Sequence, residues 1–552
     1  MARTNRGAGV PSHGGIPVSA AGVAPTIAAE LVAAARDHAD ATALRCEGRT
    51  LTFARLAAEV RAAASGLLAR GLTPGDRVAV WAPNVLDAAI ALYAIPVAGG
   101  IAVPLNPRYQ PREVAEIVGA AECALLLAPA RFRDRDYAAE AARLMGREQV
   151  VAFGPDGWGA LLAAGRAAGP AALAERAARA SGDDVVVIQY TSGTTGRPKG
   201  AALRQGPMLA TAAAWAGLVG LRPDDTYPVT YPLAHVGGFK TGLLTSMIAR
   251  ATAVLSPVQD SGSLVAMVAA LRPGVLSAPP PVLRSLLGAA DRGELGPGLR
   301  IRTVVTGSAI VPPSMVRELA QTFGTQDVIV AYGLTEATGV CTMTRRGDPV
   351  ERVCESIGTP IPGVEVRIVG DGRFAGDDGP DPAVGEIQVR RPNVMSGYWR
   401  DPAATAAVMD GGWLRTGDLG WIDPGGYVHI AGRAKDMVIV GGFNVYPAEV
   451  EHVLAAHPDV AEASAIGIPD PRLGEVVAAF VVAAPGARAD EAALLRWCQE
   501  RLANFKVPRH VWTVAALPRG AVGKVAKAEL SALAVAAHGL VPELGCQAPA
   551  GR

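Results

Sequence analysis

The sequence of 552 residues is poor in charges, in aromatic side chains and in cysteine. Only 19% of its residues are charged, and 52 basic against 51 acidic side chains leave a net charge of +1. So balanced a chain has no global field that would draw it to nucleic acid or to an anionic membrane. Its six cysteines lie far apart, without a C-x-x-C pair or a Cys/His cluster. We therefore expect no nucleic-acid partner, reduced thiols and a cytoplasmic location.

The chain also has little that resembles a signal peptide or a membrane span. Its first 25 residues mix glycine, proline, serine and two early arginines without a continuous apolar core, so we interpret 1–25 as a loose leader. The apolar stretch 88–105 contains two prolines and two glycines, which divide it into a short helix and a buried strand. We expect neither secretion nor stable membrane insertion.

The hydrophobic patterns predict an α/β fold with largely parallel sheets. Half of the residues are apolar, and the length predicts two or more domains. Helical patterns such as 53–68 alternate with short β-branched runs such as 77–81, as in crossover units. Closely spaced strands and turns predict a sheet-rich subdomain at about 358–431. We predict a leader at 1–25, a large N-terminal domain at 26–431, a hinge at 432–436, a small C-terminal α+β domain at 437–535 and a tail at 536–552.

The most informative segment is Y-T-S-G-T-T-G-R-P-K-G, residues 190–200, which follows an apolar strand pattern. Three glycines, four hydroxyls and one lysine offer backbone N–H groups, O–H donors and a cation to a polyphosphate. The spacing is not that of a Walker loop, because glycine and alanine follow the lysine. A plain surface loop would have a similar composition, but the order of these residues favours phosphate binding. The candidate ligands are Thr191, Ser192, Gly193, Thr194, Thr195 and Lys199.

Four further motifs follow in order: Tyr332-Gly-Leu-Thr-Glu-Ala, Thr416-Gly-Asp-Leu-Gly, Gly432-Arg-Ala-Lys-Asp and Gly523-Lys524. With them the chain resembles, over roughly residues 25 to 535, the adenylate-forming superfamily of acyl-CoA synthetases, firefly luciferase and peptide-synthetase adenylation domains. The resemblance implies ATP, Mg²⁺ and coenzyme A as cofactors and a small carboxylic acid as substrate. It also implies an N-terminal AMP-binding domain and a mobile C-terminal domain that rotates about Lys435 between two half-reactions.

The resemblance assigns the nucleotide residues. ATP needs a hard oxygen ligand for Mg²⁺, which Glu336 supplies, while Thr335 donates its hydroxyl to a phosphate. Asp418 suits the ribose because a carboxylate accepts from both vicinal hydroxyls, and Arg433 adds a cation to the same nucleotide. Taken alone, these residues could equally be a helix cap, a turn and a surface ion pair. The residues expected around adenine are Gly307, Ser308, Ala309, Tyr332 and Gly333.

Two further matches concern the reacting groups. Lys524 matches the family lysine that bridges the substrate carboxylate and ATP, where its charge would hold two anions together. The usual serine or threonine two residues earlier is Val522 here. Gly441, Gly442 and Phe443 match the loop on the coenzyme A side, where glycine lets the pantetheine thiol approach the backbone. A plain hairpin turn is the alternative for this loop.

The acyl site is expected around His235, which matches a family position near the incoming carboxylate. Trp215 and Phe239 could form an apolar wall, which predicts a hydrophobic acid such as a fatty acid. Lys240 is less usual and, with the segment 441–451, resembles actinobacterial ligases for steroid-derived propanoates. Its ammonium could bond a ring carbonyl or hydroxyl of a steroid- or terpenoid-derived acid. The alternative is a solvated charge at the start of a helix.

Other functions stay open beside an acyl-CoA synthetase. The adenylate could be delivered to a carrier protein or to a separate CoA-ligating partner, although the tail has no serine motif of an attached carrier domain. A luciferase-type oxygenase shares the fold. A regulatory relative without turnover predicts damage at Lys199, Glu336, Asp418 or Lys524, and all four are intact. Assembly into a homodimer is also left open.

Overall fold

The computed structural model describes residues 24–191, 198–308, 311–370, 384–433, 436–440, 443–470, 473–502, 504–520 and 524–538. The chain divides into two compact units, Met1–Gln259 with Ala270–Leu276 and Asp260–Ala269 with Ser277–Arg552. In the described ranges, no helix combines the length and the apolar character that crossing a bilayer would require. The predicted domain boundaries stay predictions.

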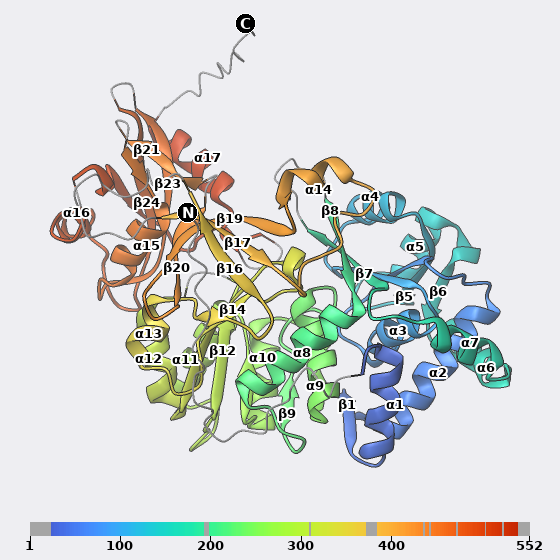
Figure 1. Cartoon of the computed structure of the whole chain (residues 1–552). Helices are drawn as coiled ribbons and strands as arrows, with labels where there is room; N and C mark the ends of the chain where they lie inside the picture. The colour runs from blue at the N-terminus through green and yellow to red at the C-terminus, as the bar shows by residue number, and fades with distance from the viewer. Residues whose placement is uncertain are drawn as a thin grey trace, which may run out of the picture. The chain divides into compact units, whose positions relative to one another are not determined.

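The first unit contains a six-stranded sheet in the order β6-β5-β3-β4-β7-β8, in which only β7 and β8 are antiparallel neighbours (Figure 1). Its strands are β3 (Arg77–Trp81), β4 (Ile101–Leu105), β5 (Cys123–Pro129), β6 (Val150–Phe153), β7 (Val185–Thr191) and β8 (Lys199–Arg204). A smaller sheet has the order β2-β1-β10-β9. Its strands are β1 (Thr42–Cys46), β2 (Arg49–Thr52), β9 (Thr226–Pro228) and β10 (Thr252–Leu255).

Helices cover the large sheet, as its nearly continuous apolar strands require. Helix α3 packs on β3 and β4, and α5 packs on β5 and β6. The α-helices of this unit are α1 (Ile27–Asp37), α2 (Phe53–Ala69), α3 (Leu86–Val97), α4 (Pro111–Ala121), α5 (Tyr137–Met145), α6 (Ala160–Ala167), α7 (Ala171–Arg179), α8 (Gln205–Val219) and α9 (Thr245–Ala249). Shorter helical turns are η2 (Arg147–Gln149), η3 (Pro155–Gly159) and η4 (Gly237–Leu244). Helix α3 includes Pro96, although prolines were among the residues expected to divide the stretch 88–105, and the stretch still forms a helix followed by the strand β4.

In the second unit, β12 and β13 are parallel, and β14 and β15 continue this sheet in antiparallel pairs. These strands are β12 (Thr303–Gly307), β13 (Asp327–Tyr332), β14 (Thr342–Met343) and β15 (Thr359–Pro360). The boundary between the units falls within α10 (Ser261–Leu271) and β11 (Val275–Ser277). The helices of the same part are α11 (Pro280–Asp291), α12 (Pro313–Phe323), η5 (Thr335–Ala337) and α13 (Val350–Glu355).

Two further sheets follow along the chain, the first antiparallel and the second antiparallel except for one parallel pair of strands. The first contains β16 (Glu365–Val369), β17 (Gly385–Arg390), β18 (Met409–Asp410), β19 (Trp413–Ile422) and β20 (Val428–Arg433), with α14 (Pro402–Val408) between its strands. The second contains β21 (Val438–Val440), β22 (Phe443–Val445), β23 (Val460–Asp470), β24 (Gly474–Ala483) and β25 (His510–Thr513). Its helices are α15 (Pro447–Ala455), α16 (Glu491–Gln499), η7 (Asn504–Lys506) and α17 (Lys527–His538).

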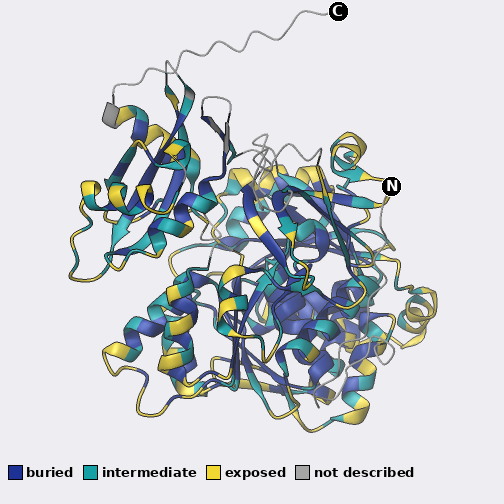
Figure 2. Cartoon of the chain, turned by 60° about the vertical axis from the view of Figure 1, so that its left-hand side comes forward, coloured by how far each residue is buried: buried dark blue, intermediate teal, exposed yellow. Residues whose placement is uncertain are grey.

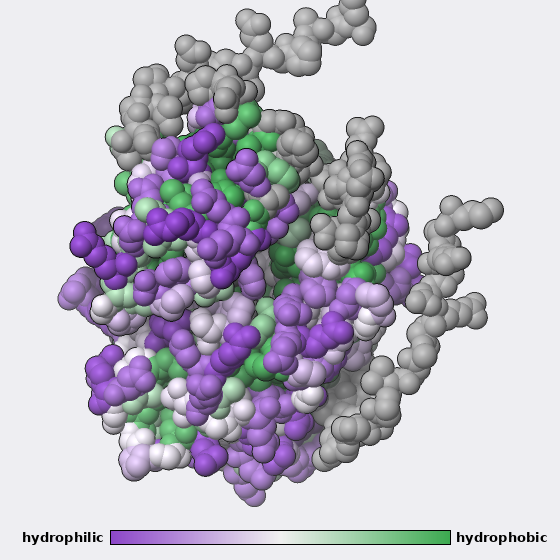
Figure 3. Space-filling view, turned by 90° about the vertical axis from the view of Figure 1, so that its left-hand side faces the viewer, coloured by the Kyte–Doolittle hydropathy of each residue, from purple (hydrophilic) through white to green (hydrophobic). Residues whose placement is uncertain are grey.

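Burial follows the sheets, because β-branched and leucine side chains of the strands meet the apolar faces of the helices. Figure 2 shows dark blue strands beside helices whose outer faces are yellow. In the C-terminal part, Val438, Phe480 and Leu494 belong to one buried cluster. Figure 3 shows a face that is mostly hydrophilic, with hydrophobic atoms in small groups between the charged ones. The described residues thus form separate buried cores, and the face in Figure 3 is mainly polar.

Candidate functional site

Strands β7 and β8 hold the two ends of the candidate phosphate loop in the first unit. Thr191 lies opposite Lys199, and its hydroxyl donates to the Lys199 carbonyl at 3.4 Å. Tyr190 lies opposite Gly200, where an added Cβ would be 2.6 Å from Ile188 Cγ2 and 3.0 Å from Tyr190 Cζ. Residue 200 must therefore be small, because the Ile188 side chain and the Tyr190 ring occupy the space that its Cβ would need. The predicted ligands Ser192, Gly193, Thr194 and Thr195 lie outside the described residues.

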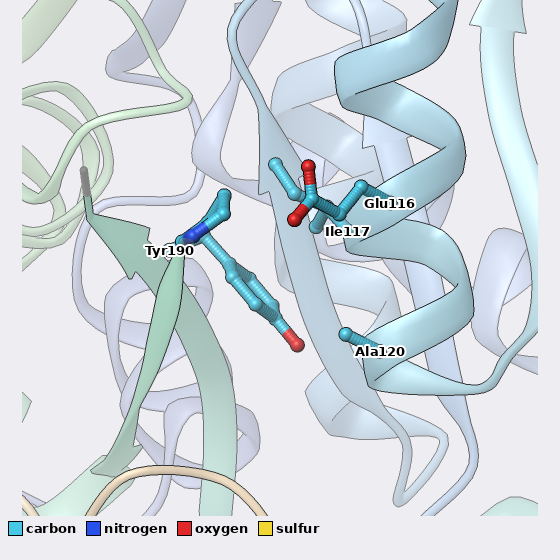
Figure 4. A pocket seen from close by; sticks show the side chains of 5 residues that line it. Glu116, Ile117, Ala120 and Tyr190 are labelled. Atoms are coloured by element: carbon cyan, nitrogen blue, oxygen red, sulfur yellow. The ribbon is translucent and has the colours of Figure 1, made fainter. Parts of the chain in front are cut away.

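A hollow of about 390 Å³ borders both strands. It is lined by Glu116, Ile117 and Ala120 of α4, and by Tyr190 and Pro198. Figure 4 shows the Tyr190 ring reaching from β7 toward α4, with its hydroxyl end near Ala120. Burial raises the pKa of Tyr190 to about 12, so the hydroxyl stays protonated at neutral pH. The lining of the hollow thus combines apolar side chains with a neutral phenol and one carboxylate.

His235 lies on a tight loop just before η4. Its backbone N–H donates to the Pro232 carbonyl at 2.9 Å, and its Nδ1 accepts from Gly237 N–H at 3.0 Å. The ring stacks on Tyr231 with 6.0 Å between centroids and 21° between planes. A Cβ on Gly238 would lie 2.0 Å from the Pro232 carbonyl oxygen, so only glycine fits there. The backbone contacts of this loop therefore fix the position of the His235 ring.

Lys240, Phe239 and Trp215 are all buried, as an apolar wall next to His235 requires. Lys240 is 0% exposed, and its Nζ lies 5.1 Å from the Trp215 ring centroid. Phe239 packs edge-on against Tyr93 at 6.2 Å. The alternative of a solvated charge at Lys240 is therefore wrong. The helix η4 is π-helical, and such wide turns occur often at functional sites.

In the second unit, Tyr332 and Asp418 meet directly. The Tyr332 hydroxyl at the end of β13 donates to Asp418 Oδ2 at 2.6 Å, and Asp418 is only 6% exposed. Burial, and next the charge of Asp418, raise the pKa of Tyr332 well above its usual value, so the phenol remains a donor. Arg433 lies opposite Asp418 in the pairing of β19 with β20. Sequence alone had predicted these residues for one nucleotide, but not their mutual bond.

Gly307 and Ser308 end β12 beside β13. Gly307 lies opposite Ala331, and a Cβ on it would be 2.0 Å from the Ala331 carbonyl oxygen. Ser308 has a positive φ of 66°, which turns the chain at this edge of the sheet. The third member of the predicted adenine segment, Ala309, lies outside the described residues. The register thus brings Gly307 and Ser308 beside the strand that carries Tyr332.

Thr335 and Glu336 form the tight turn η5 directly after β13. The Tyr398 hydroxyl donates to Glu336 Oε1 at 2.8 Å, and burial together with Glu336 raises the pKa of Tyr398. A Cβ on Gly333 would be 2.5 Å from Val340 Cα, so the backbone before this turn packs directly against the backbone that follows it. The fully buried Asn393 donates to two carbonyls of this turn, Ala337 at 3.1 Å and Val340 at 2.8 Å. Sequence reasoning missed Tyr398 and Asn393, which no motif marked.

Glu336 is suited to a Mg²⁺ ion that is shared with phosphates. The hydrogen bond from Tyr398 fixes one carboxylate oxygen of Glu336 and so orients the whole carboxylate. Within the described part of the chain, no three His, Cys, Asp or Glu side chains are grouped to hold a metal by themselves. Mg²⁺ in nucleotide enzymes is commonly bound by one or two carboxylates together with substrate phosphates. One oriented glutamate therefore fits that kind of site.

Lys524 lies in the C-terminal part, next to an isolated β-bridge, and is exposed. Its carbonyl accepts from Gly520 N–H at 2.8 Å, and Arg519 pairs with Val525. Three residues later, Lys527 Nζ lies 3.1 Å from the buried Glu451, which anchors the chain after this bridge. The backbone of Phe443 begins β22, opposite Val440. Three further predicted residues, Lys435, Gly441 and Gly442, lie outside the described residues.

Comparisons with known proteins agree with this arrangement. Residues 31–399 match the family model of the AMP-binding enzyme, and 449–524 match the AMP-binding enzyme C-terminal domain. A 3-[(3aS,4S,7aS)-7a-methyl-1,5-dioxo-octahydro-1H-inden-4-yl]propanoyl:CoA ligase of Mycobacterium tuberculosis is 41% identical over 92% of this chain and 99% of the relative.

Two solved structures are similar throughout. ATP-bound MatB from Rhodopseudomonas palustris has a TM-score of 0.77 and 34% identity, covering 92% of this chain and 98% of its own. An anthranilate CoA ligase in complex with anthranoyl-AMP has a TM-score of 0.82 and 26% identity, covering 95% and 100%. The predicted fold class and the predicted likeness to acyl-CoA ligases for steroid-derived propanoates are confirmed. With one family model matching more than half of its length, the chain belongs to the AMP-binding enzyme family.

Proposed function

We propose that the protein is an ATP-dependent acyl-CoA ligase for a hydrophobic carboxylic acid. The bonded pair of Tyr332 and Asp418 carries the proposal, because a buried carboxylate held by a neutral donor is suited to the vicinal hydroxyls of a ribose. In the first half-reaction a carboxylate oxygen attacks the α-phosphorus, the bond to the bridging oxygen breaks, and pyrophosphate leaves. In the second, the thiolate of coenzyme A attacks the acyl carbonyl and AMP leaves.

We assign the remaining roles as follows. The segment from Thr191 to Lys199 binds phosphates, and Glu336 would hold a Mg²⁺ ion, which would supply positive charge to the phosphate oxygens. Lys524 holds the carboxylate and the nucleotide together in the first step. The loop of Gly441 and Gly442 admits the pantetheine thiol in the second step. A cytoplasmic location, a homodimer and rotation about Lys435 remain predictions.

For the acid, we propose a ring compound that carries a carbonyl or hydroxyl on its ring. A lysine that is 0% exposed against an indole ring is an unusual component of an apolar wall. The ammonium is a hydrogen-bond donor in this wall, and a ring carbonyl or hydroxyl of the substrate would be an acceptor for it. A relative that acts on a dioxo-octahydro-indenyl propanoate supports this class.

Pyrophosphate release tests the function. We would measure it with a panel of hydrophobic acids, with and without coenzyme A, in the wild type and in Lys524→Ala. Acid-dependent release that yields an acyl-CoA and is lost in the variant is the expected result. Release without thioester would favour delivery to a carrier protein or to a second enzyme. No release with any acid would refute the proposal in favour of a regulatory relative.

A further inference from the structure

Two buried amide side chains hold the backbone that carries His235, residues 231–235, which we call the histidine loop. Asn84, 1% exposed, accepts from Leu233 N–H at 2.7 Å and donates to the Tyr231 carbonyl at 2.9 Å. An amide offers an acceptor and a donor on the same group, whereas a carboxylate offers only acceptors. Asn84 thus fixes two neighbouring peptide groups of the loop at once.

Gln189 holds the other end of the histidine loop. Its Nε2 donates to the Ala234 carbonyl at 2.7 Å, and the residue is 4% exposed. Gln189 lies on β7 two residues before Thr191, where the candidate phosphate loop begins. The strand that leads into the phosphate loop is therefore bonded directly to the peptide before His235.

The same backbone selects the tautomer of His235. Gly237 N–H donates to Nδ1 at 3.0 Å, and a ring nitrogen that accepts a hydrogen bond carries no hydrogen itself. The proton of a neutral imidazole must then be on Nε2. Stacking on Tyr231 fixes the plane of the ring, and Asn84 fixes the Tyr231 carbonyl. The loop therefore presents His235 with Nε2–H as a hydrogen-bond donor.

We propose that Asn84 and Gln189 are positioning residues that hold His235 so that its Nε2–H donates to the carboxylate of the acid substrate. The inference rests on the proposed function, which assigns His235 to the acid site. Neither amide needs to touch the acid, because both act through the peptides that flank the histidine. Through β7, Gln189 also keeps the histidine in a fixed relation to the start of the phosphate loop. Small displacements of a positioned donor reduce the rate strongly.

A double-mutant cycle tests this role. Gln189→Met has a similar length but no donor, and we expect kcat/KM for the acid to fall about three- to tenfold. In a His235→Ala background the same change should have almost no further effect. Gln205→Met is the matched control, since the buried Gln205 also donates to a backbone carbonyl, that of Ser181, at 2.7 Å. It should lower the unfolding temperature at least as much, because Gln205 also accepts from Ile27 N–H at 3.1 Å, but any loss of activity should be equal in both backgrounds.

Equal losses from Gln189→Met in both backgrounds would overturn the inference. If that variant does not fold, Asn84→Asp replaces it, because it keeps the acceptor for Leu233 and loses the donor to Tyr231. Nitrogen NMR of the histidine rings, with His235 assigned by His235→Ala, gives a readout without turnover. Protonation at Nε2 in the wild type and a tautomer mixture in Gln189→Met are expected, and protonation at Nδ1 would overturn the inference. A wild type that releases no pyrophosphate would refute the proposed function, while the NMR test of the tautomer would still apply.

Discussion

Removing one oxygen atom, in Tyr332→Phe, should weaken ATP use while leaving the fold intact. The lost bond, 2.6 Å from the hydroxyl to Asp418 Oδ2, involves a charged acceptor, for which about 1.5–3 kcal/mol is typical. Because the ribose hydroxyls would still reach Asp418 in the variant, the lower end of this range applies. About 1.5 kcal/mol corresponds to a KM for ATP that rises about tenfold. We expect kcat to change less, since the ring and the strand remain.

The assay is pyrophosphate release at saturating acid with ATP varied. Tyr427→Phe is the matched control, because the Tyr427 hydroxyl donates to Asp348 Oδ1 at 2.8 Å in a pair that has no role in the proposed nucleotide site. The raised pKa of Tyr332 also means that its hydroxyl remains protonated as the pH rises to about 9.5, so it should not cause KM for ATP to rise in that range. An unchanged KM in Tyr332→Phe, or the same change in Tyr427→Phe, would refute the reasoning.

Three further predictions follow from buried positions. Gly238→Ala should destabilise the protein by about 1–3 kcal/mol in denaturant unfolding, because its Cβ would lie 2.0 Å from the Pro232 carbonyl oxygen. Lys240→Met should lower kcat/KM about tenfold for acids with a ring carbonyl, and far less for the same skeleton without it, in a paired substrate comparison. Burial raises the pKa of Cys123 to about 12 and of Cys498 to about 11, so at pH 8 both thiols should be alkylated slowly in the native protein, as peptide mapping would show.

Each of these has its own control. Gly119→Ala, where nothing lies within 4 Å of the new Cβ, should be neutral or slightly stabilising, and equal losses at both glycines would contradict the steric argument. Lys506→Met removes an ammonium 5.8 Å from the Phe505 ring and should not alter substrate preference. If it does, or if Lys240→Met affects both acids equally, the carbonyl contact is wrong. Rapid native labelling of Cys498 would contradict its burial.

The sequence by itself was sufficient for the family and for the order of the elements. Motifs such as the segment 190–200 combine particular residue types at particular spacings, so they can be recognised without knowledge of the fold. The strand at 77–81 was likewise predicted from its apolar run, since short-range periodicity is a local property. Pro96 was the exception, because a proline near a helix end is tolerated by its surroundings.

Only the tertiary structure decided which side chains meet. Asn84 and Gln189 are isolated amides in the sequence, and they become important because the fold brings them to a loop about 149 and 45 residues further along. In the same way, the composition left Lys240 open as a surface charge, while packing of η4 on α8 buries it completely. Sequence spacing determines local chemistry, whereas burial and hydrogen-bond partners depend on contacts between distant segments, which no local pattern encodes.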